Sequence, residues 1–290
     1  MQFGVLGPLS AADFHAGPET EDGTRADPHD GDTWLPSAPK TRQLLALLLL
    51  HAGRQVSLTT CVRELWGEDS PRSAVQSVHT RVFQLRRALA GRPSVGSAEA
   101  AKRMLETRHQ CYVLHVREGG LDLHALDGHL AEARRGQETG DDARTSSALR
   151  SALGLWRGPT LDGLETGPHL QAQIMGLEAA RMTALEQCID AELRLGLHHR
   201  LLSELGLLVS RHPTHENLHA QYIIALYRSG RTAHALEVYR RLCRRLVDEL
   251  GIEPSHRLRD LHTAVLAERS ELDVTPPGNL RLSLDLVAGR

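Results

Sequence analysis

The sequence has few of the residues that cross-link small secreted proteins. Only four of its 290 residues are cysteine, and no two of them form a CxxC pair. A chain of this length can bury its own hydrophobic core without disulfides, so we expect free thiols or small core residues at these positions. The four cysteines are Cys61, Cys111, Cys188 and Cys243.

Long hydrophobic runs are also missing. The longest apolar stretch, Leu44–Leu50, is far shorter than the roughly 20 residues that span a bilayer. The first ten residues, MQFGVLGPLS, contain no basic cluster followed by a long apolar segment, as a secretion signal would. We therefore expect a soluble, cytoplasmic protein that has no membrane partner.

Motifs of catalysis are scarce. The chain contains neither a P-loop nor a G-x-S-x-G elbow. One motif argues for chemistry, because His215 and His219 stand in a literal H-E-x-x-H that could hold zinc, with Glu216 as general base. Seventeen histidines make this spacing easy to obtain by chance, and no clear third ligand follows. We therefore predict no enzymatic activity, no metal and no cofactor, with a zinc hydrolase as the alternative.

The net charge of −2 conceals an uneven distribution along the chain. Residues 1–33 hold seven acids and one Arg, residues 34–118 hold thirteen bases and six acids, and residues 119–290 hold twenty bases and twenty-three acids. Concentrated positive charge favours nucleic-acid binding, although chance clustering on a solvated surface explains charge alone equally well. The pattern of residues must decide between the two interpretations.

The first part of the chain reads as a strand, an insertion and a helix. FGVLGPL is strand-like, and the Gly, Pro and Asp-rich segment at about 16–32 predicts a mobile acidic insertion. A buried helix then follows, with Ser37 as N-cap, Pro39 in the first turn and Gly53 as the stop.

Two more helices are predicted before residue 91. The second covers about Leu58–Trp66, between Ser57 as cap and Gly67 as stop. The third can start after Ser70-Pro71 and covers about Ser73 to Ala90, with an apolar stripe that we expect to face the core. The stripe consists of Val75, Val78, Val82, Leu85 and Leu89.

The opposite face of the third helix is polar, and a hairpin follows it. Beyond a loop at Gly91 to Ala98, the sequence MLETRHQCYVLHV alternates as two strands would, with Arg108-His109-Gln110 between them. Three helices and a basic hairpin are the parts of a winged helix-turn-helix, although a solvated amphipathic helix is the alternative. The polar face carries Gln76, His79, Thr80, Phe83, Gln84 and Arg87, with Arg86 at its edge.

We predict that this face reads double-stranded DNA. Hydroxyl and amide groups can contact base edges, arginines suit guanine or phosphate, and the hairpin tip would touch the backbone. Phe83 is ambiguous between thymine-methyl contact and packing. The predicted DNA-binding residues are Gln76, His79, Thr80, Gln84, Arg86, Arg87, Arg108 and His109.

From Leu121 onward the pattern is helical, with breaks at Gly140, Gly196 and Gly230. Segments beginning at Arg194 and Arg228 resemble each other at an offset of 34 residues, the period of tetratricopeptide repeats. In this register Leu201 pairs with Ala235 and Leu205 with Tyr239, as small and large packing positions. The terminal segment at 271–290 reads as a loosely attached tail.

These stretches resemble the Streptomyces antibiotic regulatory proteins along nearly the whole chain. FGVLGPL, PKTRQLLALLLLHAGRQVSLTTCVRELWGEDSPRSAVQSVHTRVFQLRRAL and YVLHV look like the family's OmpR-type winged helix. SALGLWRGPTLDGL and NLHAQYIIALYRSGRTAHALEVYRRLCRRLVDELGIEPSHRLRDLH look like its bacterial transcriptional activation domain. The resemblance implies a mainly α fold with a small β component, in which residues 1–117 are the winged helix and 118–270 an all-α, tetratricopeptide-like domain.

The resemblance also implies an activity. It predicts a transcriptional activator of a secondary-metabolite gene cluster that binds direct repeats near the −35 element, as a homodimer or tandem protomers, and recruits RNA polymerase through its sigma factor and other subunits. The polymerase-contacting loop would be Gly67, Glu68, Asp69, Ser70 and Pro71. A longer acidic insertion than expected, and Cys111-Tyr112 where Gly-Tyr is usual, depart from the family pattern. A tetratricopeptide-like adaptor and a DNA-binding repressor remain as alternatives.

Overall fold

The structure of the protein is a computed structural model that describes residues 1–13 and 32–273. Its contacts divide the chain into two compact units. Unit 1 comprises Met1–Gly128 and Ala152–Arg181, and unit 2 comprises His129–Ser151 and Met182–Arg290. Unit 1 therefore takes in residues beyond the sequence-based boundary at 117/118. The predicted acidic insertion, apart from its last residue, and nearly all of the predicted tail lie outside the described residues.

Unit 1 begins with a small antiparallel sheet. Strands β1 (Gln2–Gly4), β2 (Ser10–Asp13) and β3 (Asp32–Thr33) lie in that order, with Phe3 opposite Ala11. Both of these side chains are buried, so the start of the strand-like segment FGVLGPL forms a strand that covers the core, whereas residues 5–9 of that segment form none.

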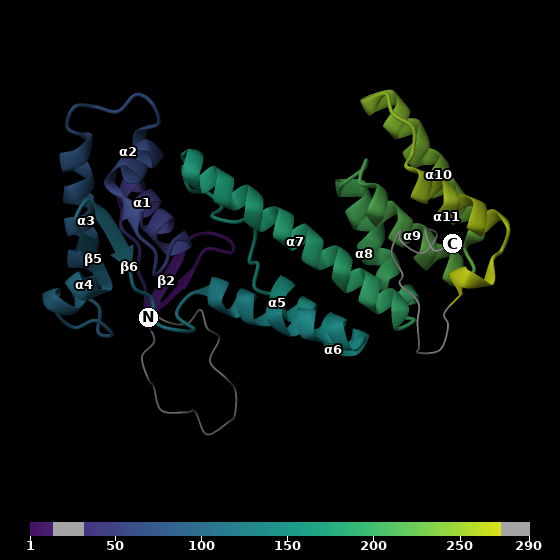
Figure 1. The fold of residues 1–290 in the computed structure, drawn as a ribbon, viewed down its shortest axis with the longest axis horizontal. Coiled ribbons are helices and arrows are strands. Elements are labelled where there is room, and N and C mark those ends of the chain that lie inside the picture. Colours follow the sequence, from purple (N-terminus) through teal and green to yellow (C-terminus); the bar gives the residue numbers. More distant parts are fainter. Residues whose placement is uncertain (14–31, 274–290) are drawn as a thin grey trace, which may run out of the picture. The chain divides into compact units, whose positions relative to one another are not determined.

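Three helices follow and pack on one another: α1 (Pro39–Leu50), α2 (Leu58–Trp66) and α3 (Ala74–Ala90) (Figure 1). The apolar run of the sequence lies inside α1, and its leucines from Leu44 to Leu49 are almost completely buried. The predicted cap at Ser37 was wrong by one residue. Ala38 holds the N-cap position without a side-chain hydrogen bond, because Pro39 fixes the first helical turn.

Helix α2 has the predicted ends. The Ser57 hydroxyl accepts a hydrogen bond from the N–H of Thr60, and Gly67 ends the helix with a φ of 64°. Helix α3 begins at Ala74, directly after the predicted Ser73, which holds the N-cap position. The buried stripe differs from the prediction at its first position, because Ala74 is buried whereas Val75 is 46% exposed. The other four predicted stripe residues are buried as expected.

The predicted hairpin is present, preceded by a helix that the sequence did not reveal. Helix α4 (Ala98–Met104) starts after the Ser97 cap and leads directly into strand β5 (Leu105–Arg108). Strand β6 (Cys111–Leu114) pairs with β5 and with the short strand β4 (Val56–Ser57), giving the order β4-β6-β5. This sheet and helices α1 to α3 form a winged helix.

The remaining chain is helical. It contains α5 (Asp122–Thr139), α6 (Asp142–Leu153) and α7 (Pro168–Arg194), and the predicted break at Gly140 separates α5 from α6. The protein is thus mainly α with a small β component, as predicted.

Unit 2 contains the predicted repeat. Helices α8 (His198–Arg211) and α10 (Thr232–Arg245) begin and end 34 residues apart, and Gly196 and Gly230 precede them with φ values of 76° and 73°. Between them lies α9 (Glu216–Arg228). Three further elements follow, namely a π-helix (Leu246–Leu250), α11 (His256–Leu266) and a 3-10 turn (Ser270–Leu272).

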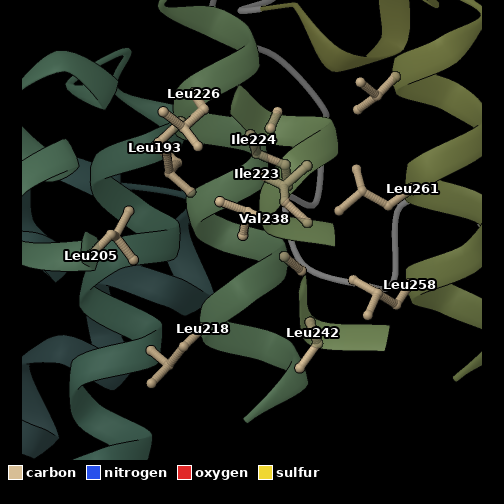
Figure 2. Close-up of a cluster of buried hydrophobic side chains, with 14 of the residues drawn as sticks. Leu193, Leu205, Leu218, Ile223, Ile224, Leu226, Val238, Leu242, Leu258 and Leu261 are labelled. Carbon is tan, nitrogen blue, oxygen red and sulfur yellow. The ribbon is translucent and has the colours of Figure 1, made fainter. Parts of the chain in front are cut away.

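A single hydrophobic cluster holds these helices together (Figure 2). It joins Leu193 of α7, Leu205 of α8, Ile223 of α9, Val238 of α10 and Leu261 of α11, all of which are buried. The positions that correspond across the 34-residue repeat are mostly buried. These are Leu201, Leu205 and Ala235, whereas Tyr239 is only partly buried.

Candidate nucleic-acid interface

One face of α3 is free to contact a partner. It comes from a helix of 17 residues, about 25 Å long, whose other side packs on α1, α2 and α4. Phe83 lies on this face with 66% of its surface exposed, so its ring is available for an apolar contact. The other predicted members of the face are exposed as well: Gln76, His79, Thr80, Gln84 and Arg87.

The side chains of Thr80 and Gln84 on α3 each form a hydrogen bond within the protein and keep groups that can still bond a partner. The Thr80 hydroxyl donates to the carbonyl of Gln76, at 3.0 Å, so its oxygen lone pairs remain as acceptors. The buried Thr41 hydroxyl donates to Oε1 of Gln84, at 3.1 Å, which fixes the amide and leaves its NH₂ group as a donor. The face therefore presents both acceptors and donors, as base-edge recognition requires.

The two adjacent arginines of α3 have different surroundings. Arg87 is exposed. Arg86 is half-buried, and its Nε and Nη2 donate to the carbonyl of Leu105 at 2.9 and 2.6 Å. Its Nη2 also donates to the Thr107 hydroxyl at 2.7 Å. Arg86 thus ties α3 to strand β5, and only its Nη1 group is left for another partner.

The tip of the wing is basic, but the guanidinium group of Arg108 is already paired with a carboxylate. Arg108 donates from Nε to Oε1 of Glu106, at 2.8 Å, and the same carboxylate contacts His115 at 2.9 Å. These hydrogen bonds, first from Arg108 and then from His115, lower the pKa of Glu106 to about 2. The carboxylate is therefore ionised at neutral pH, and any phosphate that approached Arg108 would have to compete with it.

The turn of the wing is made by His109 and Gln110. His109 has a φ of 53°, in the left-handed region that histidine enters more readily than most side chains. Cys111 is an ordinary strand residue opposite both Arg108 and Ser57. The absence of the family's usual glycine at Cys111 therefore leaves the turn intact, because the positive φ falls two residues earlier.

Sequence reasoning missed a further basic element beside α3. Helix α4 packs against α3 and exposes Lys102 and Arg103. From Ser70 to Ala98 the chain has no acidic residue, so nothing on α3 itself opposes an approaching phosphate backbone. The strong helix formers between Ser97 and Met104 were the signal that could have revealed α4.

The connection from α2 to α3 is an exposed acidic loop. Gly67 is half-buried and is followed by four exposed residues, Glu68 to Pro71. Arg63 donates to Glu68 at 2.9 Å, and this ion pair is exposed on both sides. The loop of the predicted polymerase contact is thus accessible.

The H-E-x-x-H residues have structural partners. The Nδ1 of His215 caps the start of α9, and its Nε2 lies 2.9 Å from a carboxylate oxygen of Glu186. Oε2 of Glu216 accepts from the N–H of Ser255, and Nδ1 of the buried His219 donates to the carbonyl of His215. Within the described ranges, no three His, Cys, Asp or Glu side chains are grouped to hold a metal. The tertiary fold explains the motif without zinc.

The cysteines are free, as predicted. Cys61 and Cys188 are buried, and burial raises the pKa of each thiol to about 12. Among the described residues, no helix combines the length and the apolar character that a bilayer span requires.

Two stretches of the chain match families of known proteins. Residues 32–111 match the family "Transcriptional regulatory protein, C terminal", and residues 121–266 match the bacterial transcriptional activator domain. The regulatory protein DnrI of Streptomyces peucetius is 38% identical over 277 residues, which are 96% of each chain. The regulatory protein AfsR of Streptomyces coelicolor is 35% identical over 92% of this chain, but the match spans 24% of that longer protein.

A solved structure has a similar fold over most of the chain. Mycobacterium tuberculosis EmbR, in complex with a low affinity phosphopeptide, superposes with a TM-score of 0.80 and 29% identity, over 92% of this chain and 65% of that one. A winged helix joined to a bacterial transcriptional activator domain defines a DNA-binding transcriptional regulator. The chain belongs to the Streptomyces antibiotic regulatory protein family of transcriptional activators. This is a family of regulators and not of enzymes.

Proposed function

We propose that this activator binds direct repeats beside the −35 element of promoters in a secondary-metabolite gene cluster and recruits RNA polymerase there. The single observation that carries the proposal is the exposed polar face of α3, which no other described element of unit 1 covers. A helix of this kind fits the major groove, where side chains can read base edges.

The residues of the face divide by the chemistry they offer. Gln76, Thr80 and Gln84 present hydroxyl and amide groups to bases, and His79 lies among them. Arg87 and the free Nη1 of Arg86 suit guanine or phosphate. Arg108 and His109 approach the backbone from the wing, and Lys102 and Arg103 of α4 add phosphate contacts.

Binding as tandem protomers, or as a homodimer, follows from the proposed operator. Two short repeats occupied together raise the effective concentration of each winged helix at its half-site. Membership of the Streptomyces antibiotic regulatory protein family supports an antibiotic gene cluster as the target.

The test is footprinting of the full chain on promoters of the genes that flank its own gene. We expect two protected direct repeats next to the −35 element, and a steep loss of binding with salt because the contacts are mostly to phosphate. Absence of protection on every flanking promoter would contradict the proposed target. In vitro transcription with purified RNA polymerase should rise on addition of the protein, and a fall would indicate a repressor.

The exposed loop of Gly67, Glu68, Asp69, Ser70 and Pro71 is the proposed polymerase contact. Its acidic side chains, Glu68 and Asp69, come shortly before helix α3 and are exposed, so the sigma factor of a polymerase bound beside the protein can contact them. The variant Asp69→Ala should keep its footprint and lose activation, whereas Glu118→Ala, at another exposed site of unit 1, should keep both. Full activation by Asp69→Ala would remove Asp69 from the proposed contact.

A further inference from the structure

Unit 2 contains a cavity that the DNA-binding function does not use. Its volume is about 270 Å³, and it lies among helices α8, α9 and α10. Gly206 of α8 lines the cavity without a side chain. His219 and Tyr222 of α9 also line it, and Arg241 and Arg245 of α10 contribute two guanidinium groups. The volume is slightly below the roughly 300 to 1,000 Å³ of drug-sized ligand sites, so the cavity suits a smaller molecule, and its lining mixes apolar, aromatic and polar groups as such sites do.

One nitrogen of the cavity wall has no hydrogen-bond partner among the described residues. His219 is only 7% exposed, and its Nδ1 donates to the carbonyl of His215 at 3.0 Å. Burial lowers the pKa of His219, although the hydrogen bond to His215 opposes the shift, so the ring is neutral and Nε2 carries a lone pair. Nε2 is not fully enclosed by protein atoms, so it can accept a hydrogen bond from a molecule in the cavity.

The two arginines give the cavity its charge. None of the described side chains that line the cavity is acidic. Arg241 pairs with Glu237 and Arg245 with Glu249, but both pairs lie on the surface, where such contacts exchange at little cost. Guanidinium groups bind carboxylates through paired N–H donors, so these arginines suit an organic anion.

We propose that this cavity binds a small aromatic hydroxy acid, whose carboxylate meets Arg241 and Arg245 and whose hydroxyl donates to Nε2 of His219. The apolar body lies against Val209 and Val238, and the Tyr222 ring flanks it. The Tyr222 ring already meets His234 edge to face, at 5.9 Å between centroids, which fixes it for such a contact.

The experiment is calorimetric titration of the full chain with 6-hydroxy-2-naphthoate. We expect saturable binding of one molecule per chain. The probe 2-naphthoate lacks the hydroxyl and 2-naphthol lacks the carboxylate, and each should bind about tenfold more weakly, because each leaves one part of the site unpaired. Equal binding of all three probes, or no saturable binding of the hydroxy acid, would overturn the proposal.

Two variants locate the site. The double variant Arg241→Ala and Arg245→Ala should weaken binding about tenfold or more, because charge-assisted hydrogen bonds are lost, whereas Arg244→Ala, an exposed neighbour outside the cavity, should not. Gly206→Leu should abolish binding by filling the cavity. A β-carbon at Gly206 lies in ordinary contact with the Tyr222 hydroxyl, at 3.5 Å, so Gly206→Ala should keep the fold and serve as its control. Unchanged binding in both the double variant and Gly206→Leu would place the probe elsewhere.

Discussion

The carboxylate of Glu64 accepts a hydrogen bond from the backbone N–H of Gly167 at 2.6 Å. It also accepts from the N–H groups of His169 and Leu170, at 2.9 and 3.1 Å, so a side chain of α2 caps the first turn of α7. Gln43 of α1 donates to the same carboxylate at 3.0 Å. One buried side chain thus joins the winged helix to the helical segment of unit 1.

Replacing Glu64 by Ala should destabilise unit 1 by about 2 to 4 kcal/mol, because several buried donors lose their acceptor. Urea unfolding followed by tryptophan fluorescence measures this, since all three tryptophans, Trp34, Trp66 and Trp156, lie in unit 1. The exposed Glu68→Ala should change the free energy of unfolding by less than about 1 kcal/mol. An equal effect of both variants would mean that the cap contributes nothing.

Replacing Arg87 by Ala should weaken operator binding without unfolding the protein, because the side chain is exposed on the polar face of α3 that we propose to read DNA. We expect a loss of about tenfold and a salt slope reduced by about 1 if the contact is to phosphate. Gel shift at several salt concentrations measures both, with the exposed Arg134→Ala of unit 2 as matched control. Unchanged affinity at physiological salt would argue against α3 as the reading helix.

Replacing Glu106 by Gln should strengthen DNA binding. The ionised carboxylate holds Arg108 and repels phosphate, and the neutral amide does so much less. We expect binding to tighten by about two- to fivefold at low salt and by less at high salt, as phosphate electrostatics require. Glu138→Gln, an exposed change in unit 2, is the control, and a weaker complex with Glu106→Gln would show that Glu106 positions the wing instead.

His215 should make the stability of unit 2 depend on pH. Its hydrogen bond to Glu186 raises the pKa of His215 above its ordinary value, although burial opposes the shift. The resulting stabilisation is full below the unfolded pKa of about 6.5 and is lost as the pH rises through the higher folded value. The N-cap contact of His215 with Leu218, at 3.5 Å, is too long to outweigh the shorter ion pair.

Thermal unfolding followed by circular dichroism should show this effect. The difference in midpoint between the native chain and His215→Gln should be larger at pH 5.5 than at pH 8. His219 also titrates in this unit, and its pKa is lowered mainly by burial, which both chains share. In a Glu186→Gln background the pH dependence of that difference should disappear, and its persistence would assign the effect to another group.

Local signals in the sequence predicted much of the fold. The Ser57 cap and the Gly67 stop set the ends of α2, because a side-chain acceptor and a positive φ act within one turn. The 34-residue offset of α8 and α10 was visible because each repeat carries its own packing positions. The apolar stripe of α3 gave its orientation, apart from the exposed Val75 near the start of the helix.

The sequence by itself therefore determined the winged helix, the polar face of α3, the repeat and the family. Only the tertiary structure decided that Arg86 ties α3 to the wing, that Glu106 restrains Arg108, that Glu64 caps α7 and that His219 lines a cavity. Periodicity and capping depend on neighbours a few residues apart, whereas these contacts join residues that are brought together only when the chain packs, and Glu64 lies more than 100 residues from Gly167.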